Sequence, residues 1–82
     1  MNKDEIVQVI VRNIRENVED VGSAEIDPTR SMEAYGANSL DVIEIVSCSM
    51  RDLKIKVPRT ELAQVRTVDE LADKFLQHMQ AA

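Results

Sequence analysis

The run from Gly36 to Asp41, Gly-Ala-Asn-Ser-Leu-Asp, contains the side chain best placed for chemistry, a serine just before an apolar helical pattern. Either Asn38 or Ser39 can cap this helix, and Asp41 lies three residues after Asn38, as in a capping box. We expect Ser39 to be presented at the helix start, where a plain cap is the alternative role. No general base accompanies it, which argues against an autonomous nucleophile. The helix dipole would favour a phosphate on its hydroxyl, so modification by another enzyme is chemically reasonable.

The other potentially reactive side chains lack partners in the sequence. His78 lies near the carboxyl end, with no serine or cysteine beside it, and is interpreted as a surface helix residue. Cys48 is the only cysteine and has no cation or histidine nearby to activate it, so a structural role is expected. The acidic residues of 19–38 lack the spacing and central glycine of a calcium-binding loop. We therefore expect neither a metal site nor enzymatic activity.

Length and charge narrow the class of protein further. A chain of 82 residues is long enough for one domain, 1–82, and too short for two. A net charge of -5 repels nucleic-acid phosphates, and no apolar run approaches the ~18 residues that span a bilayer. One cysteine suits a reducing compartment. We predict a monomeric cytoplasmic protein that binds neither nucleic acid nor membrane.

The charge is unevenly distributed along the chain. Residues 19–38 contain five acids and one base, whereas residues 54–66 contain four bases and one acid. The middle of the chain is therefore polarised, and acidic surfaces favour partners with basic ones.

Apolar periodicity predicts a first helix from about Lys3 to Val18. Its main apolar stripe is formed by Val7, Val11, Ile14, Val18 and Val21. The stripe is widened by Ile6, Val9 and Ile10. Many of these residues are β-branched, so packing must hold the helix. The periodicity then fades, and the breakers Gly22, Asp27-Pro28 and Gly36 predict a long loop over 19–38. We expect this loop to be tied to the core by Ile26, Met32 and Tyr35.

A second helix is predicted to start at Asn38 or Ser39 and to run to about Leu53. Its expected inward face is formed by Leu40, Ile43, Val46, Met50 and Leu53. Residues 54–57 alternate polar with apolar, but Pro58 follows and no second strand is present, so we predict a loop. A short helical turn is predicted over Pro58 to Ala63, with Pro58 at its first position.

The last helix opens with a capping box formed by Thr67 and Glu70. Its apolar face comprises Val68, Leu71, Ala72, Phe75, Leu76 and Met79. The predicted fold is therefore all-α, a small four-helix bundle with three main helices, one short helix and a long first loop.

These features together resemble the acyl carrier proteins, whose usual attachment motif is Gly-x-Asp-Ser-Leu. The resemblance covers nearly the whole chain, including Tyr35-Gly36, Val57-Pro58 and Thr67-Val68, and Ser39 falls on the motif serine. It implies that a phosphopantetheinyl transferase attaches 4'-phosphopantetheine from coenzyme A to Ser39, and that the arm then carries acyl thioesters. The chain departs from the motif at Asn38, where the family usually has aspartate. Asparagine can still cap the helix but removes one charge that helps partners recognise the site.

The resemblance also indicates a partner surface along the second helix, formed by Leu40, Asp41, Glu44, Ser47 and Met50. Arg51, Lys54 and Lys56 make the far end of this helix less acidic than in fatty-acid carriers. The chain is more similar to free-standing polyketide carriers, and its motif to donor carriers that deliver acetyl groups to a 3-hydroxy-3-methylglutaryl (HMG) synthase homologue in β-branching. Acyl-loading and condensing enzymes are the other implied partners. A fatty-acid carrier, an unmodified helical interaction module and a small hydrolase using Ser39 or Cys48 remain the alternatives.

Overall fold

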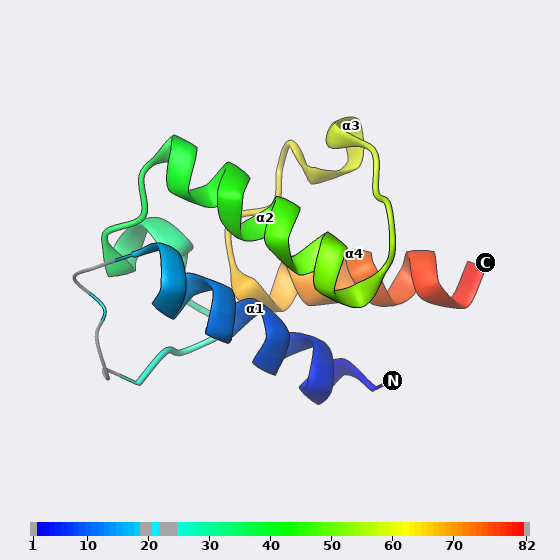
Figure 1. Ribbon diagram of the computed structural model, residues 1–82, viewed down its shortest axis with the longest axis horizontal. Coiled ribbons are helices and arrows are strands. Elements are labelled where there is room, and N and C mark those ends of the chain that lie inside the picture. The colour runs from blue at the N-terminus through cyan, green and yellow to red at the C-terminus, as the bar shows by residue number, and fades with distance from the viewer. Residues whose placement is uncertain (1, 19–20, 22–24, 82) are drawn as a thin grey trace.

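The structure is a computed structural model that describes residues 2–18, 21 and 25–81. Its elements are α1 (Lys3–Asn17), a 3₁₀ turn η2 (Met32–Tyr35), α2 (Ser39–Leu53), α3 (Arg59–Leu62) and α4 (Val68–Ala81) (Figure 1). The predicted all-α fold is confirmed, with three main helices, one short helix and a long first loop. Gly22, a predicted helix breaker, lies outside the described residues.

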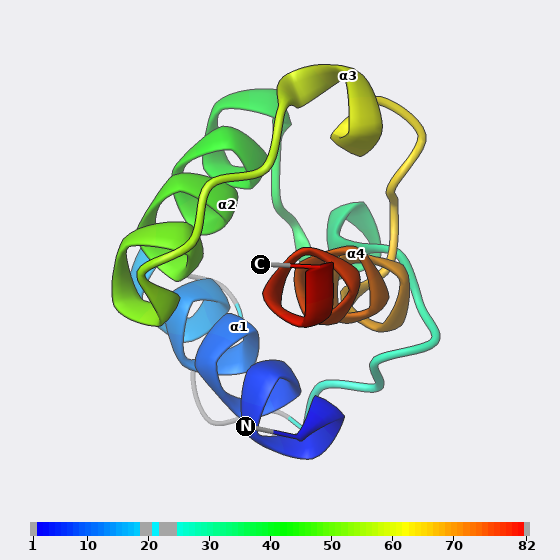
Figure 2. The ribbon, with the colours of Figure 1, turned by 90° about the vertical axis from the view of Figure 1, so that its right-hand side faces the viewer.

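The three main helices form a triangular arrangement when viewed along the long axis (Figure 2). Helix α1 packs against both α2 and α4, and α3 contacts α4. Helices α2 and α4 run in the direction opposite to α1, so the start of α2 lies at one end of the long axis. The start of α1 and the end of α4 lie toward the other end (Figure 1).

The predicted first helix is confirmed, but the residues that it buries differ from the predicted stripe. Ile6 and Ile10, which the prediction treated as widening residues, are fully buried together with Ile14, while Val7 and Val11 are half-buried. The helix begins with a reciprocal capping box in which Glu5 N donates to Asn2 Oδ1 at 2.9 Å. Helix α4 supplies the opposing wall of the core, as predicted, through Val68, Leu71, Ala72 and Phe75.

The predicted inward face of α2 is wrong at Leu40 and Ile43, but Leu53 is buried as predicted, and Val46 and Met50 are half-buried against the core. Leu40 and Ile43 are 73% and 45% exposed, and the fully buried positions are Ile45 and Ser49. The helix carries apolar side chains on more than one face, and its buried face includes a serine. Packing against α1 selects the face with Ile45, Ser49 and Leu53.

Ser49 is buried because α1 offers it a hydrogen-bond partner. Asn13 Nδ2 shares its two N–H groups among three acceptors, Ser49 Oγ at 3.2 Å, Asp52 Oδ2 at 3.1 Å and the Val9 carbonyl at 3.0 Å. Arg12 Nη2 also reaches Asp52 Oδ2 at 3.0 Å. Buried polar groups need such partners, so this cluster fixes the register of α2 on α1.

The long loop is held to the start of α4, as expected for Ile26, Met32 and Tyr35. Ile26 and Met32 are buried, and Tyr35 packs against the core. Met32 N donates to the Arg66 carbonyl at 3.0 Å, and Asp69 N donates to the Pro28 carbonyl at 2.9 Å. These bonds position the segment that leads into α2.

The second half of the chain follows the predicted order, with one correction. The segment after α2 is a loop, but Pro58 is the residue before α3 and not its first helical residue. The predicted capping box of α4 is present, since Glu70 N donates to Thr67 Oγ1 at 3.0 Å and Thr67 N donates to Glu70 Oε1 at 3.1 Å. Within the described residues, no helix is long and apolar enough to cross a membrane.

Candidate functional site

Ser39 is the first residue of α2, and its side chain is exposed. Asn38, one of the two residues predicted to cap this helix, precedes it as the N-cap. Asp41 N donates to Asn38 Oδ1 at 2.8 Å, and Asn38 N donates to Asp41 Oδ2 at 3.1 Å. This reciprocal capping box fixes the helix start on both sides of the serine.

Gly36 and Ala37 set the direction in which the chain enters α2. Gly36 ends η2 with φ 95°, a left-handed conformation that glycine adopts without the clash of a Cβ, and its N–H donates to the Glu33 carbonyl at 3.0 Å. Ala37 is buried directly afterwards. Ser39 therefore follows a turn that is held in place by the Gly36 hydrogen bond and by the buried Ala37.

The loop before Gly36 is ordered by a small polar cluster around Tyr35. The Asp27 N–H donates to Tyr35 Oη at 2.6 Å, and the Arg30 guanidinium lies 5.7 Å from the centre of the Tyr35 ring. Asp27 in turn accepts hydrogen bonds from the Thr29 side chain and backbone, which lower the pKa of its carboxyl group. Tyr35 thus links the middle of the long loop to the turn that presents Ser39.

The structure divides the predicted partner residues into two groups. Leu40, Glu44 and Ser47 are exposed along α2. Asp41 is half-buried because its carboxylate closes the capping box. Met50 is also half-buried, and its Sδ accepts a hydrogen bond from Val57 N at 3.3 Å. Only the first group forms one solvent-facing row.

An apolar groove of about 250 Å³ lies between α2 and α3. Its lining residues are Val42, Ile43, Val46, Ser47, Met50, Arg59, Leu62 and Ala63. Of these residues, only Ser47 and Met50 were predicted as site residues, and Arg59, Leu62 and Ala63 come from α3 and the residue after it. The predicted helical turn over 58–63 was the available signal, but it did not reveal which side faces α2.

Cys48 and His78 have neighbours that the sequence did not indicate. Arg51 Nη2 lies 3.4 Å from Cys48 Sγ, so the prediction that no cation stands near this thiol is wrong. His78 is half-buried, not a plain surface residue, and its Nε2 lies 2.5 Å from Glu61 Oε2 in α3. Among the described residues, no group of three or more His, Cys, Asp or Glu side chains is placed to hold a metal ion.

The described residues thus form a small helical bundle with an exposed serine, Ser39, at the start of a capped helix. The chain matches the family described as "Phosphopantetheine attachment site" over residues 5–75. It belongs to this phosphopantetheine-binding family of acyl carrier proteins. Such a protein holds its cargo on the phosphopantetheine group and is not itself a catalyst.

Two curated relatives and one solved structure support this membership. The chain is 33% identical to the polyketide biosynthesis acyl-carrier-protein AcpK of Bacillus subtilis (strain 168) over the full length of both chains. It is 31% identical to an acyl carrier protein of Wolinella succinogenes, over 83% of this chain and 84% of that one. It superposes with a TM-score of 0.83 and 33% identity on a chain in the crystal structure of the curacin biosynthetic pathway HMG synthase in complex with acetyl donor-ACP. That match covers 92% of this chain and 96% of the other.

The start of α2 fits the phosphate of a phosphopantetheine group. The Ser39 side chain is exposed, and a phosphodiester on its oxygen would lie at the positive end of the α2 dipole. The carboxylate of Asp41, two residues after Ser39, accepts a hydrogen bond from Asn38 N at 3.1 Å. The described residues at this position therefore accommodate the group.

Proposed function

We propose that Ser39 carries the phosphopantetheine arm and that residues 1–82 act as one carrier domain. The observation that carries this proposal is the exposed Ser39 side chain at the first residue of α2, within the matched family region. Other described serines are less suited to the role. Ser49 is fully buried, and Ser31 caps η2. Ser47 is exposed but lies in the middle of α2 and not at its start.

The chemistry at the site is divided between the arm and the protein. When bound, the arm supplies a terminal thiol that holds an acyl group as a thioester. The protein supplies the anchor: the capping box of Asn38 and Asp41 fixes the helix start, and the buried Ala37 fixes the turn. On this proposal, the catalytic groups that act on the thioester come from a partner enzyme.

The proposed attachment is tested by intact-mass measurement after incubation with coenzyme A and a broad-specificity phosphopantetheinyl transferase. The wild-type chain should gain the mass of one phosphopantetheine, and Ser39→Ala should gain none. Ser47→Ala, an exposed serine on the same helix, is the matched control and should be loaded like the wild type. An unmodified wild type, or a loaded Ser39→Ala, would contradict the proposal and leave an unmodified interaction module as the better interpretation.

We further propose that the carrier serves a polyketide pathway as the acyl donor to an HMG synthase homologue. The full-length similarity to a polyketide carrier supports the pathway. The similarity to a chain in the HMG synthase complex supports the partner. The alignment covers 92% of this chain and 96% of the matched chain, so the matched chain has the length of a carrier. An acyl-loading enzyme and a phosphopantetheinyl transferase are further partners on this proposal. The single cysteine is consistent with a cytoplasmic location.

The partner proposal predicts that charge at Glu44 controls transfer. Glu44→Lys should slow acetyl transfer to the curacin-pathway HMG synthase by about threefold or more at low salt, because an exposed charge near the arm steers the encounter. Glu16→Lys, the same charge change at an exposed position of α1, is the control and should transfer at the wild-type rate. Equal rates for both variants would rule out this use of α2. Faster transfer from the wild type to a fatty-acid condensing enzyme would favour the fatty-acid alternative.

A further inference from the structure

One row of side chains runs along the exposed face of α2 from Ser39 to the end of the helix. Its members are spaced by four, three, four and three residues and are all exposed: Leu40, Glu44, Ser47, Arg51 and Lys54. This spacing places them on one face of a helix. The opposite face of α2, with Ile45, Ser49 and Leu53, is buried in the fold.

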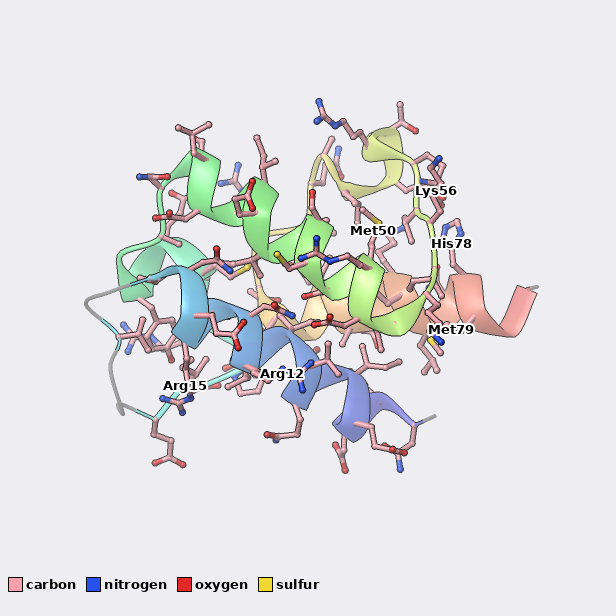
Figure 3. All side chains as sticks on the ribbon, viewed as in Figure 1. Arg12, Arg15, Met50, Lys56, His78 and Met79 are labelled. Carbon is pink, nitrogen blue, oxygen red and sulfur yellow. The ribbon has the colours of Figure 1, made fainter. Side chains whose placement is uncertain are left out.

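The row has opposite charges at its two ends. Glu44 lies one turn from the attachment end, whereas Arg51 and Lys54 lie at the far end. Lys56 and Arg59, both exposed, continue the positive charge into the segment before α3 and into α3 itself. We call the four cations Arg51, Lys54, Lys56 and Arg59 the basic end; Figure 3 shows Lys56 on the same half of the molecule as His78.

The charges of Glu44 and Lys54 are available to a partner, whereas Arg51 Nη2 lies 3.4 Å from Cys48 Sγ and its charge also acts on the neighbouring Asp52 carboxylate. Glu44 and Arg51 are seven residues apart, a rise of roughly 10 Å along the helix, so they do not neutralise each other. Within the described part of the chain, no ion pair is formed by Glu44, Lys54, Lys56 or Arg59. The ion pairs of the described residues instead join other elements, such as Lys3 to Asp69 and Arg12 to Asp52.

Lys54 allows the charge at the basic end to be separated from the stability of the fold. It is the C-cap of α2 and has φ 57°, the left-handed conformation that glycine adopts most readily. A cation at a helix C-terminus is stabilised by the dipole, whereas a Cβ is destabilised in this conformation, so the two effects oppose each other. Replacing Lys54 by glycine should therefore remove the charge with little loss of stability.

We infer that the basic end docks on an acidic patch of the synthase that accepts the acyl group. Because Arg51 and Lys54 lie 12 and 15 residues after Ser39, that patch must lie roughly 18 to 23 Å from the mouth through which the arm enters. The inference rests on the proposed attachment at Ser39 and the proposed HMG synthase partner. The basic end adds a positive contact to the negative contact at Glu44. The partner surface must therefore carry a positive charge opposite Glu44 and a negative charge opposite Arg51 and Lys54.

Two other occupants fit the row less well. Two copies of α2 in antiparallel orientation would match in charge, but their contact would cover Ser39, where the arm must remain accessible. Nucleic acid would bind the basic end, but it would be repelled by a protein with a net charge of -5. A partner enzyme can meet both ends of the row while receiving the arm.

The test uses the whole chain loaded with acetyl-phosphopantetheine by the transferase and acetyl-coenzyme A, with the curacin-pathway HMG synthase as acceptor. Arg51→Glu and Lys54→Glu should each slow acetyl transfer by about threefold or more at low salt, and the difference should shrink near 0.5 M salt. Lys54→Gly should also slow transfer while unfolding at the same or a higher urea concentration. Lys74→Glu in α4 is the matched control and should transfer like the wild type.

Each outcome decides a separate point. Equal transfer rates for Arg51→Glu, Lys54→Glu and wild type would overturn the inference, as would a Lys54→Gly variant that transfers normally. A loaded wild type that transfers nothing to the synthase would overturn the inference and the partner proposal but leave the attachment at Ser39 standing. A wild type that is not loaded would overturn the attachment itself. A dimer in sedimentation that Lys54→Glu dissociates would assign the row to a second copy.

Discussion

At the scale of single residues, Asn38 distinguishes this site from the usual family motif. Its side-chain oxygen accepts the Asp41 N–H at 2.8 Å, and its own N–H donates to the Asp41 carboxylate. An aspartate could make the same cap, because both residue types are favoured at this position. The structural role therefore does not require asparagine, and we expect the charge that asparagine lacks to affect partner recognition and not the cap.

Substitutions at Asn38 should separate these two roles. Asn38→Ala removes the cap and should lower the free energy of unfolding by about 1 kcal/mol in urea titrations. Asn38→Asp should unfold like the wild type and be loaded by the transferase, yet change which acceptor enzymes use the acetylated protein. Unchanged partner preference in Asn38→Asp would show that the missing charge has no such effect.

The caps were the residue-scale features best predicted from sequence. The pairs Asn38 with Asp41 and Thr67 with Glu70 are both confirmed, because a capping box depends on residues three apart and on little else. The contact of His78 with Glu61 was missed, since it joins helices whose relative placement no local pattern specifies.

At the scale of elements, α2 shows where periodicity fails. Its apolar residues occupy several faces, so a stripe through Leu40 and Ile43 looked as plausible as the true one through Ile45. The true stripe also contains Ser49, which an apolar pattern does not include. Asn13 satisfies that serine from α1, 36 residues away in the chain, and this partner was not predictable from the sequence of α2 alone.

The same contact makes stability depend on pH. Hydrogen bonds from Asn13, and then from Arg12, hold the pKa of Asp52 below its usual value near 3.8. A lowered folded-state pKa stabilises the fold above pH 3.8, and this contribution is lost as the pH falls through the folded value. Asp52→Asn should therefore be less stable than wild type at neutral pH, and the difference should shrink as the pH falls below 3.8 and through the lowered folded-state pKa.

Urea unfolding at a series of pH values measures this difference. Glu25→Gln, an exposed loop carboxylate, is the control and should follow the wild-type curve. A constant difference between Asp52→Asn and wild type at all pH values would mean that the carboxylate charge is not responsible.

At the scale of the whole molecule, the fold places charges of opposite sign toward the two ends of one exposed row on α2. The sequence predicted an acidic segment over 19–38 and a basic one over 54–66, but not that Glu44 and Arg51, which lie between these segments, share one exposed row with Lys54. The groove between α2 and α3 was also not predictable, because α3 is a single turn with no buried residue and no periodic pattern. Its position follows from long-range packing around α4.

The placement of the chain ends has a practical consequence. The start of α1 and the end of α4 lie toward one end of a molecule 36 Å long, and the start of α2 lies at the other (Figure 1). A fluorescent fusion or a solid support joined through either end would be held away from Ser39. Immobilised carrier could then be loaded and unloaded in place, with successive enzymes washed over the same sample.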